Sequence, residues 1–520
     1  MGKHLVRSGA IVSAMTLISR VLGLVRDVVI ANLLGAKAEA DVFFFANKIP
    51  NFLRRLFAEG AFAQAFVPVF TETKETGELS DVRALVAKVS GTLGVLVTIV
   101  TFLGVVGAPV VTAIFGTGWF IDWWNDGPNG EKFERASLLL QITFPYLWFI
   151  TFTALSGAIL NSLGRFAVAA FTPVFLNIAI IGFALWVSPQ LDQPEMGLAW
   201  GVFFGGMIQF AFQLPFLWRA KMLVKPSWGW NTPGVVKIRT LMIPALFGVS
   251  VSQINLLFDT LIASFLMTGS ISWLYYSDRL LEFPLGLFGI AIATVILPHL
   301  SAKHVSDGKE AFAATVDWGV RAVCCLGFPA ALGLVVLAQP MLMVLFMHGA
   351  FDVSDSRMAS YSLVAYGSGL VSFMLVKVLA PGYYARQDTK TPVRFGIVAM
   401  ISNMFFNLVF AIPFGYVGLA IATSLSATLN AALLYRGLSK QGVFRISKES
   451  ISVLVRMLGA AVVMAAVIGL LKPQEAQWIA YEFSMRVTVL AGLILAGGVT
   501  YLSALLLLGI RPRDLVSRGS

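Results

Sequence analysis

Charged and amide side chains interrupt an otherwise apolar stretch near the N-terminus of this 520-residue chain. The side chains concerned are Lys48, Asn51, Arg55 and Glu59. Intervals of three and four residues place all of them on one face of a helix. A charged group within a membrane costs roughly 2.5 to 3.5 kcal/mol on insertion scales. We therefore expect this face to line a water-filled cavity or to meet a ligand of opposite charge.

Basic residues of this kind occur in both halves of the chain and exceed the acidic residues near them. The set comprises Arg20, Arg26, Lys48, Arg54, Arg55, Arg279 and Lys377. Excess positive charge in a cavity favours an anionic ligand, and the planar guanidinium of arginine matches phosphate oxygens bidentately. Several such groups together could hold a diphosphate where water is scarce. The sequence therefore predicts a cationic substrate-binding cavity.

Acidic residues in the same segments have two interpretations. These residues are Asp27, Glu59, Asp278 and Glu282. Either they support the basic groups inside the cavity, or they form ion pairs that hold helices together. Both interpretations stay open for Arg20, Asp27, Asp278 and Glu282. We favour ligand binding for Arg26, Arg54, Arg55, Arg279 and Lys377, because the basic groups exceed the acids available to neutralise them.

The sequence contains no pattern typical of catalysis or of metal binding. Its four histidines form no metal-ligand spacing, and the adjacent Cys324 and Cys325 lie in an apolar run, where we interpret them as packing residues. A phosphate-binding glycine loop and a Gly-x-Ser-x-Gly nucleophile motif are both missing from the sequence. We therefore expect a protein that is not an enzyme and that uses no cofactor.

The composition of the chain is that of a membrane protein. Its residues are 58% hydrophobic and 12% charged, whereas soluble domains carry roughly 25% charged residues. Apolar runs of about 18 residues or more recur, each long enough to cross a hydrocarbon core about 30 Å thick. These runs do not alternate as barrel strands do, so they predict an all-α polytopic protein with about fourteen transmembrane helices. The expected spans begin near Ser8, Val42, Val89, Leu138, Val168, Gly197, Leu241, Trp273, Val320, Ser360, Val393, Gly418, Ile451 and Val487.

An internal repeat organises these spans. The tripeptide Thr-Pro-Val at 172–174 is followed by Gly-Leu-Ala at 197–199, and the same pair recurs at 391–393 and 418–420. An even number of helices separates the copies, so both copies have the same orientation in the membrane. An axis along the membrane normal would relate them, as in transporters built from two lobes.

A second pattern supports the repeat. The stretches 43–68 and 275–298 each place charges first, then Leu-Phe, then an apolar run that ends at a proline. We therefore expect a six-helix lobe at 1–222 and a second at 223–449. The two additional helices at 450–520 have no counterpart in the repeat.

The net charge of +11 has a topological explanation. Basic residues concentrate in the loops on the side shared by the two termini, which the positive-inside rule assigns to the cytoplasm. Nucleic-acid binding is not expected, because this charge bias is the usual topogenic one.

With these motifs in place, the chain resembles the MurJ/MviN family. The matching segments are 19–23 with Arg26-Asp27, 51–62, 275–280 with 282–284, and 377–384 with 386–388. They follow one another in the family's order, and the resemblance extends from about Ser13 to the C-terminus. The family belongs to the exporter superfamily that includes multidrug exporters with two six-helix lobes.

The resemblance implies a flippase for lipid II, the undecaprenyl-diphosphate-linked disaccharide-pentapeptide used in cell-wall biosynthesis. Lipid II would pass from the cytoplasmic to the periplasmic leaflet of the bacterial inner membrane by alternating access. The basic and acidic residues named above would lie in or near the central cavity, with Asp41 as a further supporting acid. The last two helices could form a groove for the lipid tail. Since some members of the family bind sodium between spans seven and eleven, Asp259 and Asp388 are candidate sodium ligands.

Other expectations follow from the same resemblance. Lipid II and membrane lipids are the expected partners, cell-wall synthesis proteins are further candidates, and the chain is expected to act as a monomer. The membrane potential or a monovalent ion would supply the energy. Two alternatives stay open: a small-molecule or drug exporter of the same superfamily, and a non-transporting scaffold for envelope assembly whose buried charges are structural pairs.

We predict that both termini and the loop at 219–239 face the cytoplasm, because basic residues concentrate there. A membrane-impermeant thiol reagent applied to intact cells should label Gly127→Cys and leave Ser227→Cys unlabelled. Labelling of Ser227→Cys without labelling of Gly127→Cys would reverse the topology.

Overall fold

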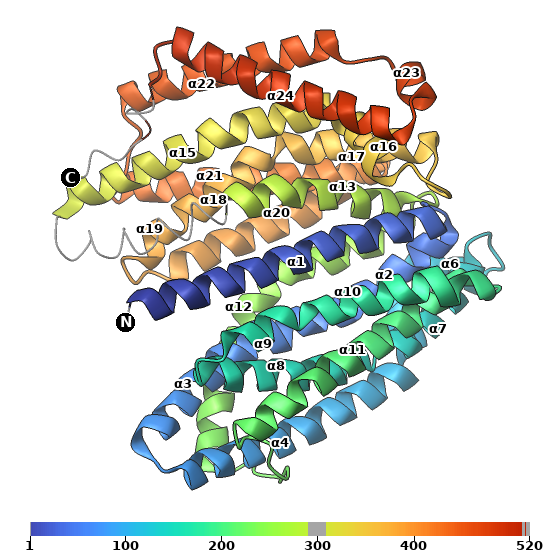
Figure 1. The fold of residues 1–520 in the computed structure, drawn as a ribbon, viewed down its shortest axis with the longest axis vertical. Helices are drawn as coiled ribbons and strands as arrows, with labels where there is room; N and C mark the ends of the chain where they lie inside the picture. The colour runs from blue at the N-terminus through green and yellow to red at the C-terminus, as the bar shows by residue number, and fades with distance from the viewer. Residues whose placement is uncertain (1, 290–307, 512–514, 516–520) are drawn as a thin grey trace. The chain divides into compact units, whose positions relative to one another are not determined.

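The computed structural model describes residues 2–289, 308–511 and 515, and it describes their side chains except at 2–9, 57–60, 252 and 289. The described residues form helices and contain no strand, which confirms the predicted all-α class. The chain divides into two compact units, Met1–Ser272 and Trp273–Ser520 (Figure 1).

Several helices of the first unit have a proline in their first turn. Four of its helices, α5, α10, α11 and α12, have proline in the first turn, where the missing N–H needs no partner. Helix α11 packs against α7, α8 and α10, while α12 packs against α3 and η1. The elements are α1 (Gly2–Leu34), α2 (Ala38–Leu53), η1 (Arg54–Ala61), α3 (Phe62–Thr76), α4 (Leu79–Val106), α5 (Ala108–Phe115), α6 (Thr117–Trp124), α7 (Gly130–Thr143), α8 (Tyr146–Ser162), α9 (Phe166–Phe171), α10 (Pro173–Gly182), η2 (Phe183–Val187), η3 (Ser188–Gln190), α11 (Pro194–Arg219) and α12 (Pro233–Ala263).

A row of phenylalanines on α3 anchors one core of this unit. Phe62, Phe66 and Phe70 follow at intervals of four residues, and their neighbouring ring centroids lie 5.4 and 5.5 Å apart. All three are buried and pack with Leu85 of α4 and Ile238 of α12. Burying one such side chain contributes about 1.5 to 3 kcal/mol relative to exposure in water. This packing joins α3 to α4 and α12.

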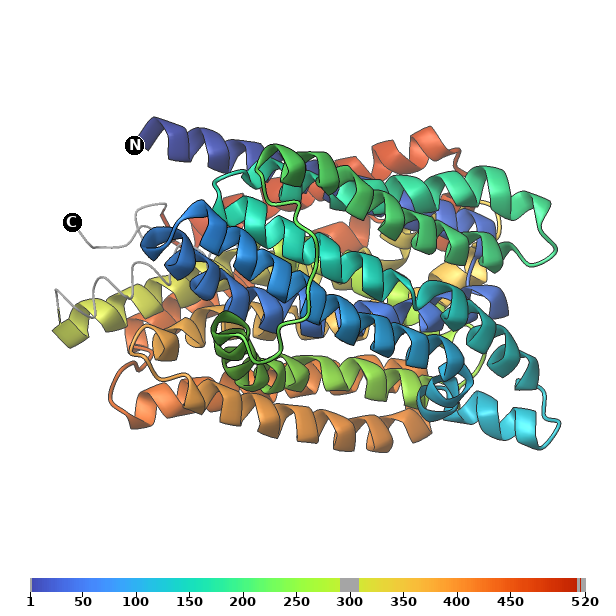
Figure 2. The same cartoon turned by 90° about the horizontal axis from the view of Figure 1, so that it is seen from below.

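The second unit is also built from long apolar helices. Helices α20 and α21 pack along one another, as the orange ribbons of Figures 1 and 2 show. Helix α22 packs against α15 and α24, and the Tyr501 hydroxyl donates to the Cys325 carbonyl at 2.6 Å. Both cysteines are free and buried. The elements are α13 (Ser270–Pro284), which begins just before the unit boundary, η4 (Leu285–Gly289), α15 (Gly308–Val336), α16 (Ala338–Phe346), α17 (Val353–Ser368), α18 (Leu370–Leu379), α19 (Pro381–Tyr384), α20 (Lys390–Phe414), α21 (Tyr416–Lys440), α22 (Lys448–Leu471), α23 (Glu475–Ala480) and α24 (Phe483–Leu507).

Among the described residues, 11 helices are long and apolar enough to cross a membrane. They coincide with eleven of the expected spans, so the chain is a multi-pass membrane protein. The expected spans near Ser8, Val42 and Trp273 are not among them. Those three segments contain the charged residues of α1, α2 and α13, and the third continues into residues outside the described part. The expected count of fourteen therefore stays a prediction.

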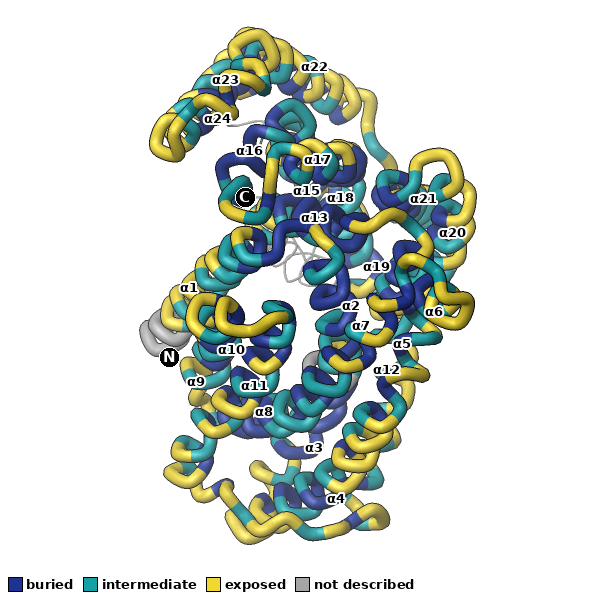
Figure 3. The backbone as a smooth tube through the Cα atoms, turned by 90° about the vertical axis from the view of Figure 1, so that its right-hand side faces the viewer, coloured by how far each residue is buried: buried dark blue, intermediate teal, exposed yellow. Residues whose placement is uncertain are grey.

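Many helices present apolar side chains on their outer surface. On α4, Phe102 and Leu103 are 66% and 61% exposed, and on α20 Ile412 is 88% exposed. In Figure 3, α20 is drawn largely in the colours of exposed and intermediate residues. Water would disfavour such a surface, whereas lipid tails match it.

The boundary between the units differs from the boundary expected from the repeat. The structure counts α12 with the first unit, because α12 packs against α3 and η1. The predicted lobes at 1–222 and 223–449 rest on sequence similarity and stay a prediction. Each repeat stretch contains a π-helical segment near its charged residues: η1 carries Arg54 and Arg55, and η4 follows the charged residues of α13. The end of the second stretch, at Pro298, lies outside the described residues.

We predict that Gly104→Ala lowers the thermal stability of the purified protein. A Cβ at Gly104 would lie 2.0 Å from Cε1 of Phe144, so the ring would have to move, at a cost of about 1 to 3 kcal/mol. Gly248→Ala in α12 is the matched control, because nothing lies within 4 Å of its Cβ position and alanine favours a helix. Equal melting temperatures for the two variants would contradict close packing at Gly104.

Candidate functional site

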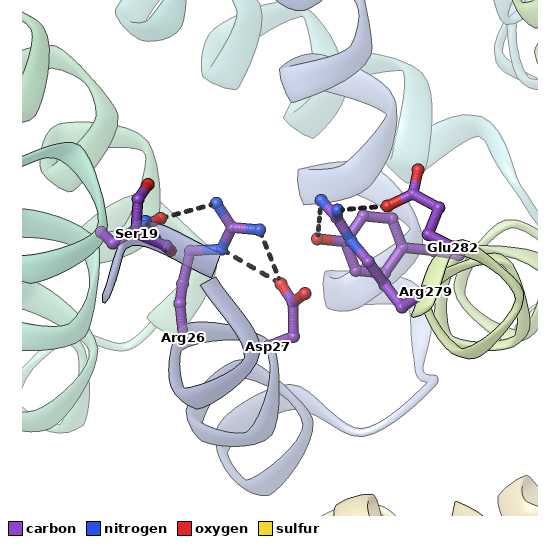
Figure 4. A network of polar contacts seen from close by, with 7 residues as sticks. Ser19, Arg26, Asp27, Arg279 and Glu282 are labelled. Atoms are coloured by element: carbon purple, nitrogen blue, oxygen red, sulfur yellow. Dashed lines mark hydrogen bonds and ion pairs between the residues drawn. The ribbon is translucent and has the colours of Figure 1, made fainter. Parts of the chain in front are cut away.

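Helix α1 holds an arginine in a network that reaches α10. Arg26 Nη2 lies 2.9 Å from Asp27 Oδ1, and Nη1 donates to Asn177 Oδ1 at 3.0 Å (Figure 4). Asn177 in turn donates to the Ser19 carbonyl at 3.2 Å. The Asp27 side chain is only 2% exposed, so its charge depends on Arg26 for compensation. Arg26 therefore has a structural contact in addition to any contact with a ligand.

Asn177 was not among the residues predicted from the sequence. An isolated asparagine in the apolar run that follows the repeated Thr-Pro-Val is the signal that could have identified it. Its amide bridges α10 to α1 and fixes the direction of the Arg26 side chain.

Two other predicted arginines lie at the surface of the first unit. Arg20 on α1 and Arg55 on η1 are exposed, and neither has an ion-pair partner within the part of the chain that the structure describes. Arg54 is half-buried, and its Nε is buried without a hydrogen bond. The side chain of Glu59 lies outside the described residues. Among the predicted cavity arginines of this unit, Arg20 and Arg55 are thus the exposed ones.

The helical segment that carries Arg54 and Arg55 has π-helical hydrogen bonding. It spans Arg54–Ala61, between α2 and α3, and it packs against α12. A π segment widens the helix locally and occurs frequently at functional sites. Because extra residues are inserted into the turn, the simple one-face pattern expected from Lys48 to Glu59 does not hold unchanged across it.

Lys48 and Asp259 belong to neighbouring helices of the first unit. Lys48 Nζ donates to Thr260 Oγ1 at 3.2 Å, which links α2 to α12. Asp259 precedes this threonine and is half-buried.

Asp41 caps a helix. Its carboxylate accepts from Gly269 N at 2.7 Å, from Ser272 N at 3.0 Å and from Ser272 Oγ at 2.6 Å. A carboxylate at a helix N-terminus satisfies otherwise unpaired N–H groups and interacts favourably with the helix dipole. The nearby Lys132 supports the same loop by donating to Thr268 Oγ1 at 2.6 Å. The structure therefore gives Asp41 a positioning role at the start of α13.

In the second unit, α13 presents Arg279 together with Glu282. Arg279 Nη1 lies 3.0 Å from Glu282 Oε2, and Nη2 donates to the Tyr275 hydroxyl at 3.1 Å (Figure 4). The guanidinium carbon also lies 5.0 Å from the centre of the Tyr275 ring. The Arg279 and Glu282 side chains are 33% and 48% exposed, so solvent screens this pair. Asp278 beside them is half-buried.

Lys377 and Asp388 have different surroundings in the second unit. Lys377 on α18 is half-buried and has no ion-pair partner among the described residues. Asp388 accepts from Thr391 Oγ1 at 2.6 Å and from Thr391 N at 3.1 Å. These hydrogen bonds hold the pKa of Asp388 below its ordinary value. Asp388 thus stabilises the first turn of α20.

Two further ion pairs were not predicted from the sequence. Arg135 Nη2 lies 2.7 Å from Oε1 of the fully buried Glu195, which links α7 to α11. In the second unit Glu475 accepts from Arg357 and Gln339, and these contacts lower the pKa of Glu475. Their partners are far apart in sequence, so no local spacing could identify them. Both pairs join helices.

The described residues contain no group of three or more His, Cys, Asp or Glu side chains suited to a metal ion. Asp259 and Asp388, the candidate sodium ligands, lie in the first and the second unit respectively. The sodium site therefore stays a prediction.

Comparisons with known proteins agree over nearly the whole chain. Residues 30–489 match the family model described as lipid II flippase MurJ. A Vibrio cholerae protein named probable lipid II flippase MurJ is 67% identical over 515 residues, which cover 99% of this chain and 98% of that protein. A solved structure of lipid II flippase MurJ in an inward closed conformation has a TM-score of 0.81 at 26% identity, covering 97% and 99% of the two chains. An inward-facing multidrug resistance MATE transporter of the MOP superfamily shares the fold, with a TM-score of 0.68 at 12% identity and coverage of 83% and 97%.

We predict that Asp41→Asn destabilises the purified protein by about 1 to 3 kcal/mol, because the amide loses the charge and turns an N–H group towards donors. Asp126→Asn is the matched control, since the Asp126 side chain is exposed and asparagine tolerates its φ of 55°. Thermal unfolding in detergent measures the difference. A melting temperature of Asp41→Asn equal to that of the control would contradict the capping role.

Proposed function

The chain belongs to the MurJ family of lipid II flippases, and on this basis we propose that it carries lipid II from the cytoplasmic to the periplasmic leaflet of the bacterial inner membrane. The reaction is translocation without covalent change, so the site needs binding groups and no catalytic residue. The substrate has a hydrophilic part that must cross the membrane, consisting of the diphosphate, the sugars and the peptide. Its polyprenyl tail can stay in lipid throughout.

The observation that carries this proposal is the unbalanced positive charge of the first unit. Arg20 and Arg55 are exposed without an ion-pair partner among the described residues, and Asn177 orients Arg26. A diphosphate supplies the oxygens that planar guanidinium groups bind bidentately. In the second unit, Lys377 is a further half-buried cation. In this mechanism, the basic groups hold the diphosphate while alternating access exposes it to one side and then to the other.

The last two helices suit the proposed lipid-tail groove in their chemistry. Helix α22 exposes Val455 and Leu470 at 63% and 87%, and α24 exposes Leu495 at 69%. The two helices pack against each other, and α22 also packs on α15. Their exposed side chains are apolar, as a polyprenyl chain requires.

The membrane potential is the energy source that the charge of the substrate favours. Moving one elementary charge across a potential of 100 mV changes the free energy by about 2.3 kcal/mol. An interior-negative potential therefore favours outward movement of the anionic headgroup. A monovalent ion is the second energy source within this proposal. We further propose cytoplasmic termini, a monomeric carrier and contact with cell-wall synthesis proteins.

Two alternatives make different demands on the charged residues. An exporter of cationic drugs would need free carboxylates, but Arg26 compensates the buried Asp27. A non-transporting scaffold would need its charged residues in structural ion pairs. The contact of Arg279 with Glu282 is the observation that favours this alternative. Mutation of paired and of unpaired arginines separates these alternatives.

Arg55 offers the cleaner test, because no carboxylate depends on it among the described residues. We predict that Arg55→Ala abolishes lipid II flipping in proteoliposomes at unchanged membrane abundance. Arg55→Lys should restore it only partly, because the ammonium keeps the charge and loses the bidentate geometry. Arg83→Ala, which removes an exposed arginine of α4, is the control and should keep full activity. Normal flipping by Arg55→Ala would exclude Arg55 from substrate binding.

Arg279 tests the scaffold alternative. If Arg279 binds substrate, Arg279→Ala and the double variant Arg279→Ala with Glu282→Gln should both reach the membrane and both fail to flip lipid II. If the residue only forms a pair with Glu282, the double variant should recover function. Abundance and flipping are measured together, and a functional double variant would refute the role of Arg279 as a ligand.

A further inference from the structure

The loop between α11 and α12 is fixed along α4. Ser227 N donates to the Ala87 carbonyl at 3.0 Å, Gly229 N donates to Thr92 Oγ1 at 2.9 Å, and Lys88 Nζ donates to the Trp228 carbonyl at 3.2 Å. Gly91 permits this approach, because a Cβ there would lie 2.0 Å from the Ser227 oxygen. The loop therefore presents its side chains from a fixed backbone.

Large aromatic side chains stand out from this loop and from the helix end before it. Trp228 and Trp230 stack with ring centroids 6.2 Å apart and are 53% and 37% exposed. Trp218, in the last turn of α11, is 71% exposed. Tryptophan has an apolar ring and a polar N–H, and it concentrates where a membrane span meets water. Because α11 is one of the candidate spans, its end lies where such an interface is expected.

Basic residues occur in the same segment as these tryptophans, and the segment has no acidic residue. Arg219, Lys221 and Lys225 are exposed, and Arg239 lies with its guanidinium carbon 4.4 Å from the centre of the Trp230 ring. The segment 219–240 contains no aspartate or glutamate. Lys237 is a separate case, because it pairs with Glu72 of α3 at 3.2 Å.

The position of Lys221 adds a conformational argument. Its φ is 61°, and the hydrogen bonds from Lys221 N to Trp218 O and from Met222 N to Leu217 O form the usual left-handed end of a helix. Glycine is the residue that adopts this conformation without strain. A lysine here costs stability and places a charge at the end of α11, beside the exposed Trp218.

We propose that this surface, formed by Trp218, Lys221, Lys225, Trp228, Trp230 and Arg239, binds the phosphate headgroup of anionic phospholipids. Lysine and arginine near a membrane surface attract anionic lipids, and the guanidinium of Arg239 is held in place by the Trp230 ring. The tryptophans insert at the level of the headgroups and keep the basic groups there. An acidic protein segment would also match the charge, but it would not require exposed indoles at the end of a membrane span. The surface lies outside the residues proposed to bind the transported lipid.

The test uses the full-length protein in phosphatidylcholine vesicles doped with a photoreactive phosphatidylglycerol. Illumination followed by peptide mass spectrometry locates the labelled residues. We expect label on the segment 218–230 of the native protein. In the triple variant Lys221→Gly, Lys225→Gln, Arg239→Gln, the labelling of this segment should fall about five-fold for each charge removed. Lys221→Gly also relieves the left-handed strain, so misfolding should not cause the loss.

The matched control removes three exposed basic residues at the end of α21, in the following loop and at the start of α22. The variant Lys440→Gln, Arg445→Gln, Lys448→Gln should keep the native labelling of 218–230, and raised salt should weaken labelling only where charge drives it. Equal labelling of the loop variant and the native protein would overturn the proposal. So would equal labelling by a photoreactive phosphatidylcholine, or capture of an acidic protein on this segment without lipid label.

Discussion

The scarcity of water around the helices is the constraint on which the rest of this structure depends. Within lipid, each backbone polar group must be hydrogen-bonded inside the protein, and each charge needs a partner, a ligand or a wet surface. The backbone requirement explains why the described chain is helical. The charge requirement explains why ionisable residues gather on a few helices. Eleven helices are apolar enough to face lipid, while the charged residues concentrate in the three expected spans that are not among those eleven.

The charged residues of these helices have different structural roles. Arg26 compensates a buried carboxylate and is tied to α10 by Asn177, while Asp41 and Asp388 hold the beginnings of α13 and α20. Arg55 is exposed and forms no ion pair with the described residues. Removing one member of a buried pair is costly, whereas removing an exposed cation is not. A loss of transport after mutation therefore has a clear meaning at Arg55 and needs a measurement of abundance at Arg26.

The two π-helical segments connect the sequence repeat with the proposed mechanism. The segment η1 carries Arg54 and Arg55, and η4 follows Arg279 and Glu282 of α13. A π segment shifts the side chains that follow it to a different face of the helix. It allows one helix to present charges to a polar site and apolar residues to lipid. A π segment near charged residues in each half agrees with the internal repeat that the sequence predicts.

The sequence alone determined the helical class, eleven of the spans, the excess of basic residues and the resemblance to the family. These features depend on composition and local spacing, because a long apolar run can cross a bilayer as a helix and a charge within such a run is costly in lipid. Only the tertiary structure decided which charges are compensated. Arg26 meets Asn177, and Arg135 meets Glu195, across long separations in sequence. It also placed the loop at 221–232 along α4, where Gly91 lets two backbones touch. Such contacts depend on how helices pack against one another, and local spacing carries no information about that packing.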